Sequence, residues 1–349
     1  MALKIRGVRL PERDEVVLRI DGDRLRTSTL EEDDVLVIDG GWLLPGLVDV
    51  HTHPGTEKPG DQFELALFRE HMIQHRDAGV LAVRSPGSAD PDSARVHDDI
   101  ELPRLYTGGR WLATPGRFFA GFGRDVSEAE LADAAVEEAK ASSGWCKIIG
   151  DWLPGDPPVS LEALTAAVRG VRAIGGRVSV HCQTAEGSRN AVLAGADSLE
   201  HGMHLDHSLL PRMAEQGTAL VPTFTTFAKT VGQLGRGEPE HIREWLQTGW
   251  DGLFQTTRAA HNAGVTVLAG TDHKPCGEIA GEIEWLIRAG LPADAAVGAG
   301  SWIARSWLGL PGLEDGGWAD VVAYETDPTE DLTVLKRPSR IVLRGRVVR

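Results

Sequence analysis

The 349-residue sequence predicts an α/β fold, in which eight parallel strands and eight helices form a (β/α)8 TIM-like barrel and both ends of the chain form a small β-sandwich domain. Three observations predict this fold. Eight short apolar segments alternate with amphipathic helical stretches over about 270 residues, which is the usual size of such a barrel. Short β-branched runs occur at both ends of the chain. Hydrophobic residues make up 42% and charged residues 25% of the sequence, as in ordinary globular proteins.

Both ends of the chain favour short strands. Residues 16–20, 25–27 and 35–38 are aliphatic runs separated by Asp-Gly and charged pairs, and residues 321–324 and 341–343 follow the same pattern. Such runs, bounded by turn residues, are typical of strands. We therefore expect residues 1–45 and 318–349 to form the β-sandwich domain together, and residues 46–317 to form the barrel.

The central region alternates between strand-like and helical patterns. Ser127 and Glu130 have the spacing of a capping box, and Ser160 and Gly175 mark the expected start and end of another helix. Alternation of this kind favours repeated βα units around a parallel sheet. The expected barrel strands are, in order, residues 43–50, 80–83, 104–106, 145–149, 177–180, 197–199, 219–221 and 265–268.

Charge and composition limit the partners and the compartment. The chain has 36 Lys and Arg against 51 Asp and Glu, a net charge of −15 that repels phosphate backbones, so we expect no nucleic-acid partner. It begins without a signal-peptide pattern and has no apolar run of the roughly 18 residues that a membrane span needs. Its three cysteines suggest neither a disulfide framework nor a thiolate metal site. We expect a cytoplasmic protein that acts on a small molecule without binding a membrane, and the sequence leaves room for a homo-oligomer.

The strongest chemical signal is the segment from Leu44 to His53, an apolar strand that ends in His-Thr-His. Residues two apart on a strand point the same way, so His51 and His53 can reach one cation. Imidazole nitrogen suits zinc and similar metals. Because His-x-His pairs also occur in solvated turns, this motif alone leaves the question open.

Polar residues on other strands support a metal site. His181, His201 and Asp272 each follow an apolar run, and Lys147 lies within another. Their separations fit multiples of the roughly 30 residues in a βα unit. The chemistry of a barrel gathers where its strands end, so these side chains should converge at one rim.

Lys147 needs its own explanation, because a lysine in an apolar strand is unfavourable unless its charge is paired or removed. One interpretation is a buried ion pair or a side chain that reaches solvent. The other is a carbamate formed with carbon dioxide, which turns the amine into a carboxylate-like bridge between two cations.

These motifs together resemble the amidohydrolase superfamily, in its imidazolonepropionase-like and Xaa-Pro dipeptidase-like branch. The resemblance covers nearly the whole chain, from Leu44-Pro45-Gly46 to the closing strands. It implies two divalent metal ions, with zinc the favoured metal, and carbon dioxide as a lysine carbamate. The implied ligands are His51, His53 and Asp272 for one metal, His181 and His201 for the second, and Lys147 as the bridge.

The chain also departs from this branch. Many relatives carry a Gly-Gly-His segment after the third strand, where this chain has Thr114 to Phe118. It also lacks a tyrosine after the seventh strand that could bind a substrate carboxylate. Arg117 could take that role, although a solvated arginine is the simpler interpretation, and His273 could line the pocket.

The predicted reaction is hydrolysis of an amide (C–N) bond in a small molecule such as an N-acyl amino acid or a dipeptide. Two cations sharing a water lower its pKa, and the bridging hydroxide then attacks the carbonyl. Asp272 would accept the proton and pass it to the leaving nitrogen. A cyclic-amide hydrolase of the imidazolonepropionase or hydantoinase type, a lactonase or phosphotriesterase, and a metal-free scaffold remain alternatives. A deaminase is disfavoured, because Thr184 stands where a Glu is usual.

Overall fold

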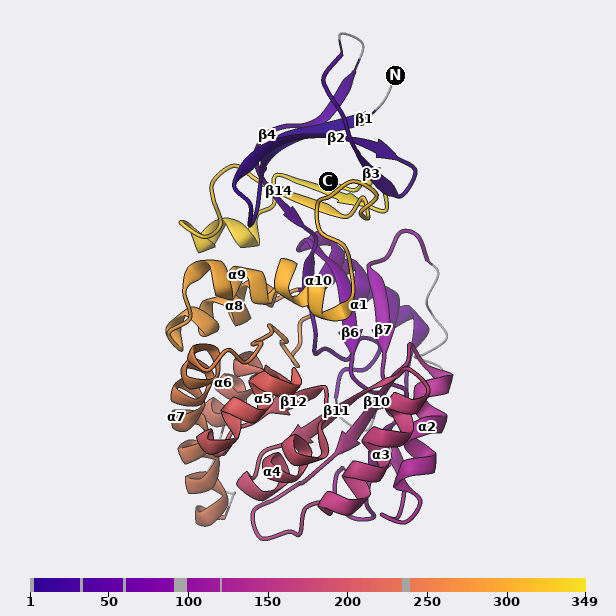
Figure 1. Ribbon diagram of the computed structural model, residues 1–349, viewed down its shortest axis with the longest axis vertical. Helices are drawn as coiled ribbons and strands as arrows, with labels where there is room; N and C mark the ends of the chain where they lie inside the picture. The colour runs from indigo at the N-terminus through magenta and orange to yellow at the C-terminus, as the bar shows by residue number, and fades with distance from the viewer. Residues whose placement is uncertain (1–2, 32–33, 59–60, 91–98, 120, 234–238) are drawn as a thin grey trace.

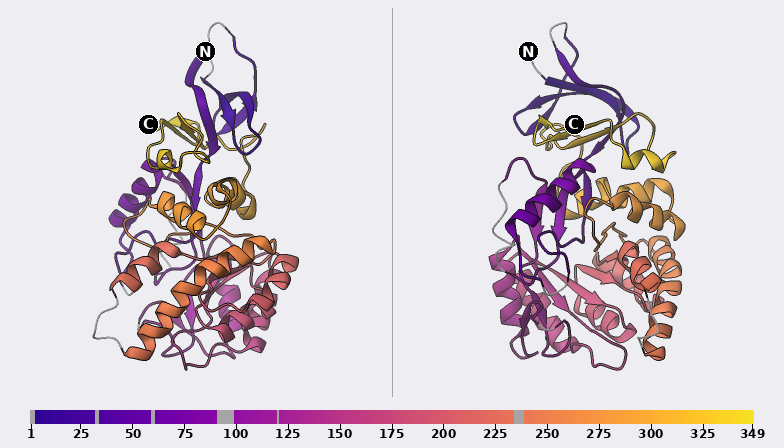
Figure 2. Two further views of the ribbon diagram at one scale, coloured as in Figure 1. Left: turned by 90° about the vertical axis from the view of Figure 1, so that its left-hand side faces the viewer. Right: turned by 180° about the vertical axis from the view of Figure 1, so that it is seen from behind.

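The computed structural model describes residues 3–31, 34–58, 61–90, 99–119, 121–233 and 239–349. Both termini lie at one end of an elongated molecule, in a sheet above the helices and parallel strands of the central region (Figure 1). Views from the side and from behind show the same arrangement (Figure 2). The central region, with its parallel strands and surrounding helices, makes up most of the molecule.

The terminal sheet combines the two ends of the chain. Strand β4 pairs in parallel with β1 and antiparallel with β14, and so joins the N-terminal strands to the C-terminal ones. A separate apolar core that includes Ile5, Leu18 and Val342 lies beneath this sheet. Its seven strands run in the order β16 (Arg346–Val347), β15 (Arg340–Leu343), β14 (Val321–Tyr324), β4 (Val35–Pro45), β1 (Leu3–Arg9), β2 (Asp14–Asp21) and β3 (Arg24–Thr27).

The central strands form two parallel sheets, which confirms an α/β fold. One sheet has the order β5 (Leu47–Asp49), β6 (Val80–Ser85) and β7 (Arg104–Thr107). The other has the order β13 (Ala219–Val221), β12 (Ser198–His201), β11 (Arg177–Cys182), β10 (Trp145–Ile149), β8 (Trp111–Ala113) and β9 (Arg124–Asp125).

Helices pack against these sheets and shield their apolar side chains. Helix α3 begins where the sequence predicts, because the Ser160 hydroxyl accepts a hydrogen bond from the Ala163 backbone N–H. Ser127 does bond to Glu130, but α2 begins only at Leu131. The helices are α1 (Leu65–Asp77), α2 (Leu131–Ala141), α3 (Leu161–Ala173), α4 (Ala185–Ala194), α5 (Leu210–Gln216), α6 (Phe224–Gln233), α7 (Glu240–Asn262), α8 (Ile279–Arg288), α9 (Ala293–Ala299) and α10 (Trp302–Leu308), with 3-10 turns at His207–Leu209 and Leu332–Lys336.

The first and last expected barrel strands differ from the prediction. The expected strand at 43–50 is two strands, because the chain passes at Gly46 from the terminal sheet (β4) to a parallel one (β5). The expected strand at 265–268 makes a single bridge, between Val267 and Leu220, instead of a ladder. Backbone hydrogen bonds still connect this segment to both neighbours: Leu268 donates to Leu220 at 3.0 Å, and Val50 donates to Ala269 at 3.1 Å.

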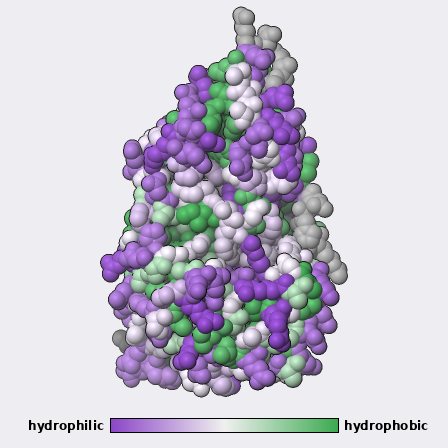
Figure 3. Space-filling view, viewed as in Figure 1, coloured by the Kyte–Doolittle hydropathy of each residue, from purple (hydrophilic) through white to green (hydrophobic). Residues whose placement is uncertain are grey.

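The surface is predominantly hydrophilic on the face seen in Figure 3, with apolar residues in scattered patches. Within the described part of the chain, none of the helices has the length and apolar character needed to cross a membrane.

Candidate metal centre

A cavity of about 470 Å³ is lined by the residues that the sequence suggests as metal ligands. The lining combines side chains from the ends of several parallel strands with loops and with α6 and α7. A volume of this size suits a small organic ligand. All six predicted metal ligands line it, namely His51, His53, Lys147, His181, His201 and Asp272.

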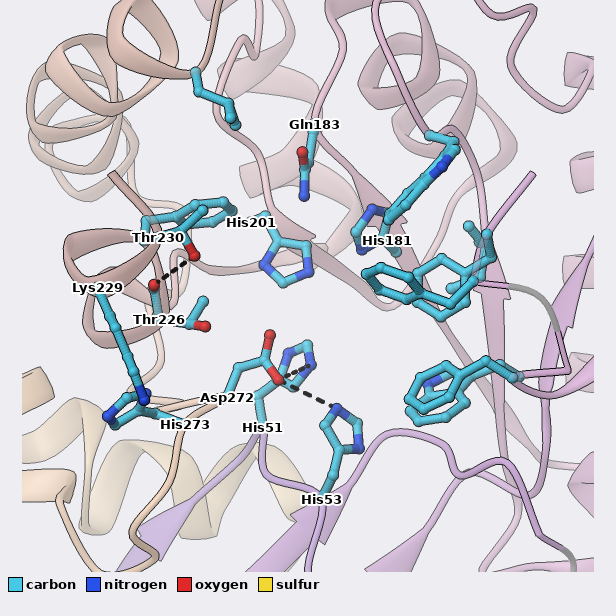
Figure 4. Close-up of a pocket in the computed structure, with 18 of the residues that line it drawn as sticks. His51, His53, His181, Gln183, His201, Thr226, Lys229, Thr230, Asp272 and His273 are labelled. Carbon is cyan, nitrogen blue, oxygen red and sulfur yellow. Dashed lines mark hydrogen bonds and ion pairs between the residues drawn. The ribbon is translucent and has the colours of Figure 1, made fainter. Parts of the chain in front are cut away.

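The tightest cluster in the cavity consists of His51, His53 and Asp272. One ligand atom from each lies within 4.8 Å of the others. The Asp272 Oδ1 atom lies 3.4 Å from His53 Nε2 and 3.9 Å from His51 Nε2. Figure 4 shows the Asp272 carboxylate directed between these two rings. This geometry leaves room for one cation among the three side chains.

The second pair of histidines adjoins this cluster. The rings of His181 and His201 have centroids 4.6 Å apart, and the His201 ring lies 5.3 Å from that of His51. The neighbouring strands β11 and β12 place them there, since Cys182 pairs with His201 across the ladder. Two adjacent groups of donors therefore share one cavity.

Hydrogen bonds to one nitrogen orient three of the four rings. His51 Nδ1 lies 2.7 Å from a Glu200 oxygen, His53 Nδ1 lies 2.8 Å from the Gly87 carbonyl oxygen, and His201 Nδ1 lies 2.7 Å from the Thr223 hydroxyl. A partner on one ring nitrogen fixes the ring and leaves Nε2 available to a metal. Such partners are characteristic of metal-ligating histidines.

His181 lacks a partner for a buried nitrogen. Among the described residues, its Nε2 atom is buried and has no hydrogen-bond partner. Buried polar atoms are nearly always paired, so an unpaired one in a cavity requires an explanation. A cation held beside His201 would provide that partner, and the donor set therefore fits a divalent metal.

The protonation states suit metal binding. Burial, together with the nearby Lys147 charge, lowers the pKa of His51 to about 4 and that of His181 to about 3. Burial also lowers the pKa of His201 well below its usual value. Burial alone would raise the pKa of Asp272, but the charge of His51 and the hydrogen bond from His53 outweigh it and lower that pKa. Neutral imidazoles and an ionised carboxylate are the forms that bind metals.

Lys147 lies among these ligands and is 2% exposed. It is the middle residue of β10, paired with Trp111 of β8 and Ser179 of β11. Burial lowers its pKa to about 8, while the charges of Glu200 and Asp272 act in the opposite direction. The lowered pKa favours the neutral amine, which is the form that reacts with carbon dioxide.

The backbone is strained where two ligands sit. His201 and Asp272 have φ values of 72° and 45°, and Thr223, which bonds to His201, has 52°. Non-glycine residues seldom adopt such angles, and they persist only where the surroundings impose them. A fixed contact is visible at Asp272, whose N–H donates to the His51 carbonyl oxygen at 2.6 Å. At Gly270, a Cβ atom would lie 2.6 Å from that of His51, so this close approach requires glycine.

The sequence analysis did not identify two buried charged residues, Glu200 and Arg84, as parts of the site. Glu200 bonds to His51 through one oxygen and accepts from Arg84 through the other at 2.9 Å. The Arg84 guanidinium also donates to the Val50 carbonyl oxygen at 2.6 Å. Both are fully buried. The available signal was a charged residue within an apolar strand, the same signal that singled out Lys147.

Asp49 connects the segments that carry the first ligand cluster. It is fully buried, and its carboxylate accepts hydrogen bonds from the backbone N–H of His51 and from both the N–H and the hydroxyl of Thr271. These bonds hold the residue before Asp272 beside the strand that carries His51. Asp49 was visible in the sequence only as part of the motif around the histidine pair.

The two predicted substrate contacts are placed differently. His273 lines the cavity, as expected for a pocket residue. Arg117 is not among the lining residues, and it forms an ion pair with Asp156. The simpler interpretation of Arg117 therefore describes its position better than a role in binding substrate.

A second group of polar residues supports the loop that carries His53. The Lys274 ammonium donates to the His53 carbonyl oxygen at 2.8 Å and to His71 Nδ1 at 3.0 Å, and it lies 3.4 Å from Cys276 Sγ. His71 and His75 are buried on α1, so their spacing reflects packing, as the absence of a zinc-protease motif suggests.

Comparison of the sequence with known proteins identifies a family and several relatives. Residues 42–348 match the amidohydrolase family. An uncharacterized protein of Mycobacterium tuberculosis is 39% identical over 359 aligned positions, which cover 99% of this chain and 95% of that protein. The imidazolonepropionase of Rhizorhabdus wittichii is 28% identical over 300 positions, covering 73% and 70% of the two chains. The ochratoxinase of Aspergillus niger is 32% identical over 170 positions, covering 47% and 35%.

Solved structures share the whole fold. A Xaa-Pro dipeptidase with methionine in its active site superposes with a TM-score of 0.83 at 24% identity, covering 99% of both chains. The A. niger ochratoxinase superposes with a TM-score of 0.82 at 21% identity, covering 99% of this chain and 95% of that one. With its match to the family over most of its length and its cluster of histidines and aspartate, the chain belongs to the amidohydrolase family and is a hydrolase acting on carbon–nitrogen bonds.

Proposed function

We propose that the protein is a metal-dependent (β/α)8-barrel hydrolase that cleaves the amide bond of a small molecule such as an N-acyl amino acid or a dipeptide. The observation that carries the proposal is one cavity that brings together His51, His53 and Asp272 with a buried, unpaired Nε2 on His181. A bound cation would account for both features.

The residues present would hold two divalent ions, with zinc the favoured metal. His51, His53 and Asp272 would bind the first, and His181 and His201 the second. Lys147, once converted to a carbamate by carbon dioxide, would contribute an oxygen to each. Divalent cations at these positions would supply Lewis acidity, which makes water acidic enough to serve as a nucleophile near neutral pH.

The proton transfers depend on Asp272. Its side chain is 24% exposed towards the cavity, whereas the Glu200 carboxylate is fully buried and already bonded to His51 and Arg84. Asp272 accepts the proton of the attacking water and donates it to the leaving nitrogen, so that the amine departs in its neutral form. General acid–base transfers of this kind contribute about 10²- to 10⁴-fold to a rate.

A cyclic-amide hydrolase is the second candidate, and the similarity to an imidazolonepropionase favours it. Ring opening of a cyclic amide uses the same ligand set and the same acid–base group. The two candidates differ only in how the rest of the cavity accepts the substrate. Lactone or phosphotriester hydrolysis on the same ligands would be recognised by the same substrate panel.

Two measurements test the proposal. Metal analysis of protein purified without added metal should give about two equivalents of zinc, whereas the absence of metal would favour a scaffold. Isotopically labelled bicarbonate should label Lys147, and Lys147→Ala should lose both the label and the second metal. Activity should be screened on N-acyl amino acids, Xaa-Pro dipeptides, hydantoins and lactones. Metal-loaded protein that cleaves none of the amides would refute the proposed reaction.

A further inference from the structure

The cavity extends beyond the predicted metal ligands, and its two sides differ in chemistry. One side is aromatic and comes from the segment around β8 and the loop after β10. The other side comes from α6 and α7 and combines apolar side chains, among them Phe227 and Trp245, with the polar side chains of one face of α6. In Figure 4 the α6 side chains Thr226, Lys229 and Thr230 lie on one side of His201 and Asp272, and His181 lies on the opposite side. A substrate bound at the ligands would therefore have unlike surroundings at its two ends.

The aromatic side adjoins the ligands directly. Trp111 has its ring 4.9 Å from that of His53 and stacks on Phe122 at 4.0 Å. Phe118 lies 5.8 Å from His181 and 5.0 Å from Trp152. Rings that line a cavity in this way offer a flat apolar surface, and an aromatic ligand can pack edge-to-face or offset against them.

The outer edge of this aromatic surface is not ordinary core. Phe119 is 46% exposed, yet its ring lies 4.8 Å from that of Trp152. Phe119 therefore extends the aromatic surface to the edge of the cavity, where a bound ring would remove apolar surface from water. The cluster thus favours an aromatic or similarly flat occupant.

The polar side presents an unpaired cation. Thr226, Lys229, Thr230 and Gln233 have helical spacings of three, four and seven residues, so they share one face of α6, and all four line the cavity. Lys229 is exposed, and among the described residues it has neither an ion-pair nor a hydrogen-bond partner, so its ammonium is free to bind an anion in the cavity.

The other two lysines of the lining are committed elsewhere. Lys147 lies in β10 among the predicted metal ligands, and the ammonium of Lys274 already donates to the His53 carbonyl oxygen and to His71. Arg117, the basic residue that the sequence suggested, is held by Asp156 outside the lining. Lys229 is therefore the lysine in the described cavity wall that remains available to an anion.

We infer that Lys229 binds a carboxylate of the substrate while the aromatic surface around Phe118 holds a ring. The substrate class is then a small amide whose scissile C–N bond lies between an aromatic group and a carboxylate, as in an N-aroyl amino acid. This inference rests on the proposed amide hydrolysis and specifies its substrate.

The kinetic test compares N-benzoylglycine with N-ethylbenzamide, in which a methyl group replaces the carboxylate. Metal-loaded wild-type protein should favour N-benzoylglycine by about 10- to 100-fold in kcat/KM, the scale of a hydrogen bond to a charged group. Lys229→Met should remove that preference by slowing N-benzoylglycine only. Lys140→Met, at an exposed position of α2, is the matched control and should leave both rates unchanged.

The aromatic side needs its own variant. Phe118→Ala should lower kcat/KM for N-benzoylglycine severalfold and leave N-acetylglycine nearly unaffected, because the acetyl group has no ring to pack. Equal losses on both substrates would show that Phe118 only supports the fold, and would overturn the aromatic part of the inference.

A binding measurement separates the inference from the reaction on which it rests. The γ-phenylbutyrate anion has the ring and the carboxylate of N-benzoylglycine at the same spacing but no amide bond. Its affinity, measured by calorimetry, should fall by about tenfold or more in Lys229→Met. Lys229-dependent binding without hydrolysis of any amide would support the binding of an aromatic carboxylate at Lys229 and refute the proposed reaction. Amide hydrolysis with no effect of Lys229→Met on either measurement would leave the reaction standing and overturn the inference.

Discussion

Replacing Glu200 by glutamine tests whether a buried ion pair holds the first metal ligand in place. The Glu200 carboxylate lies between His51 Nδ1, at 2.7 Å, and Arg84 Nη2, at 2.9 Å, and it also accepts from the Ser198 hydroxyl at 2.5 Å. Glu200→Gln preserves the volume but removes the charge. The Arg84 guanidinium is then buried without its counter-ion, next to Trp145 and Trp307 at 5.0 and 5.2 Å.

The expected loss of stability follows from this burial. Removing one partner of a buried pair costs about 3–5 kcal/mol, because the other charge is left uncompensated. The entropy of unfolding is about 2.1 cal/mol/K per residue at about 60 °C, so a chain of this length has about 0.7 kcal/mol/K. Glu200→Gln should therefore lower Tm by about 4–7 °C. Losing the partner of a ligating histidine should also weaken metal binding by about 10- to 100-fold.

Thermal unfolding of the metal-free protein and a metal titration against a chelator measure the two effects separately. Glu186→Gln, at an exposed position at the start of α4, is the matched control and should change stability by less than about 0.5 kcal/mol. The double variant Arg84→Met with Glu200→Gln should lose less than the sum of the single losses, since the two residues contact each other. A Glu200→Gln protein with wild-type Tm and wild-type metal affinity would refute the reasoning.

Three further predictions concern single substitutions. Asp272→Asn should fold normally and reduce kcat by about 10²-fold or more, because it cannot take up the proton; wild-type turnover would contradict this role. Lys274→Met should weaken metal binding by about tenfold, since Lys274 positions the backbone of His53, and a chelator competition showing unchanged affinity would exclude it as a positioning residue. Burial raises the pKa of Glu282 to about 8 from an unfolded value near 4.5, so its contribution to stability is complete below about pH 4.5 and is lost as the pH rises to about 8. The free energy of unfolding, measured by urea denaturation at several pH values in this range, should fall with rising pH more steeply for the wild type than for Glu282→Gln, by up to about 1.4 kcal/mol per pH unit. An equal dependence on pH in the two proteins would disprove a protonated Glu282.

The general architecture could be predicted because it depends on local patterns. Short apolar runs and amphipathic stretches alternate in the printed sequence, and most of the expected strands form where they were placed. The family resemblance rested on motifs such as the histidine pair after an apolar strand. The sequence placed His51, Lys147 and His181 on strands whose ends were expected to meet at one rim, so their convergence on one cavity was also predictable, although β5 and β10 belong to different sheets.

Strand boundaries were less predictable, since they depend on pairing partners. Residues 43–50 form one continuous apolar run in the sequence, but Gly46 divides it because β4 finds its partners in the terminal sheet and β5 in a parallel sheet. Residues 265–268 have the pattern of a strand yet make only one bridge. The hydrophobic pattern is the same whether or not a neighbouring strand is in register.

The sequence by itself determined the alternation of strands and helices, the joining of strand-forming segments at both ends and the identity of the metal-ligand candidates. Only the tertiary structure decided which charged groups meet: Glu200 with Arg84 and His51, Arg117 with Asp156, and Lys229 with no partner in the described lining. The physical reason is the separation along the sequence of the residues that interact. Element type and side-chain direction follow from periodicities of two to four residues, whereas ion pairing and burial depend on contacts between residues that lie far apart along the chain.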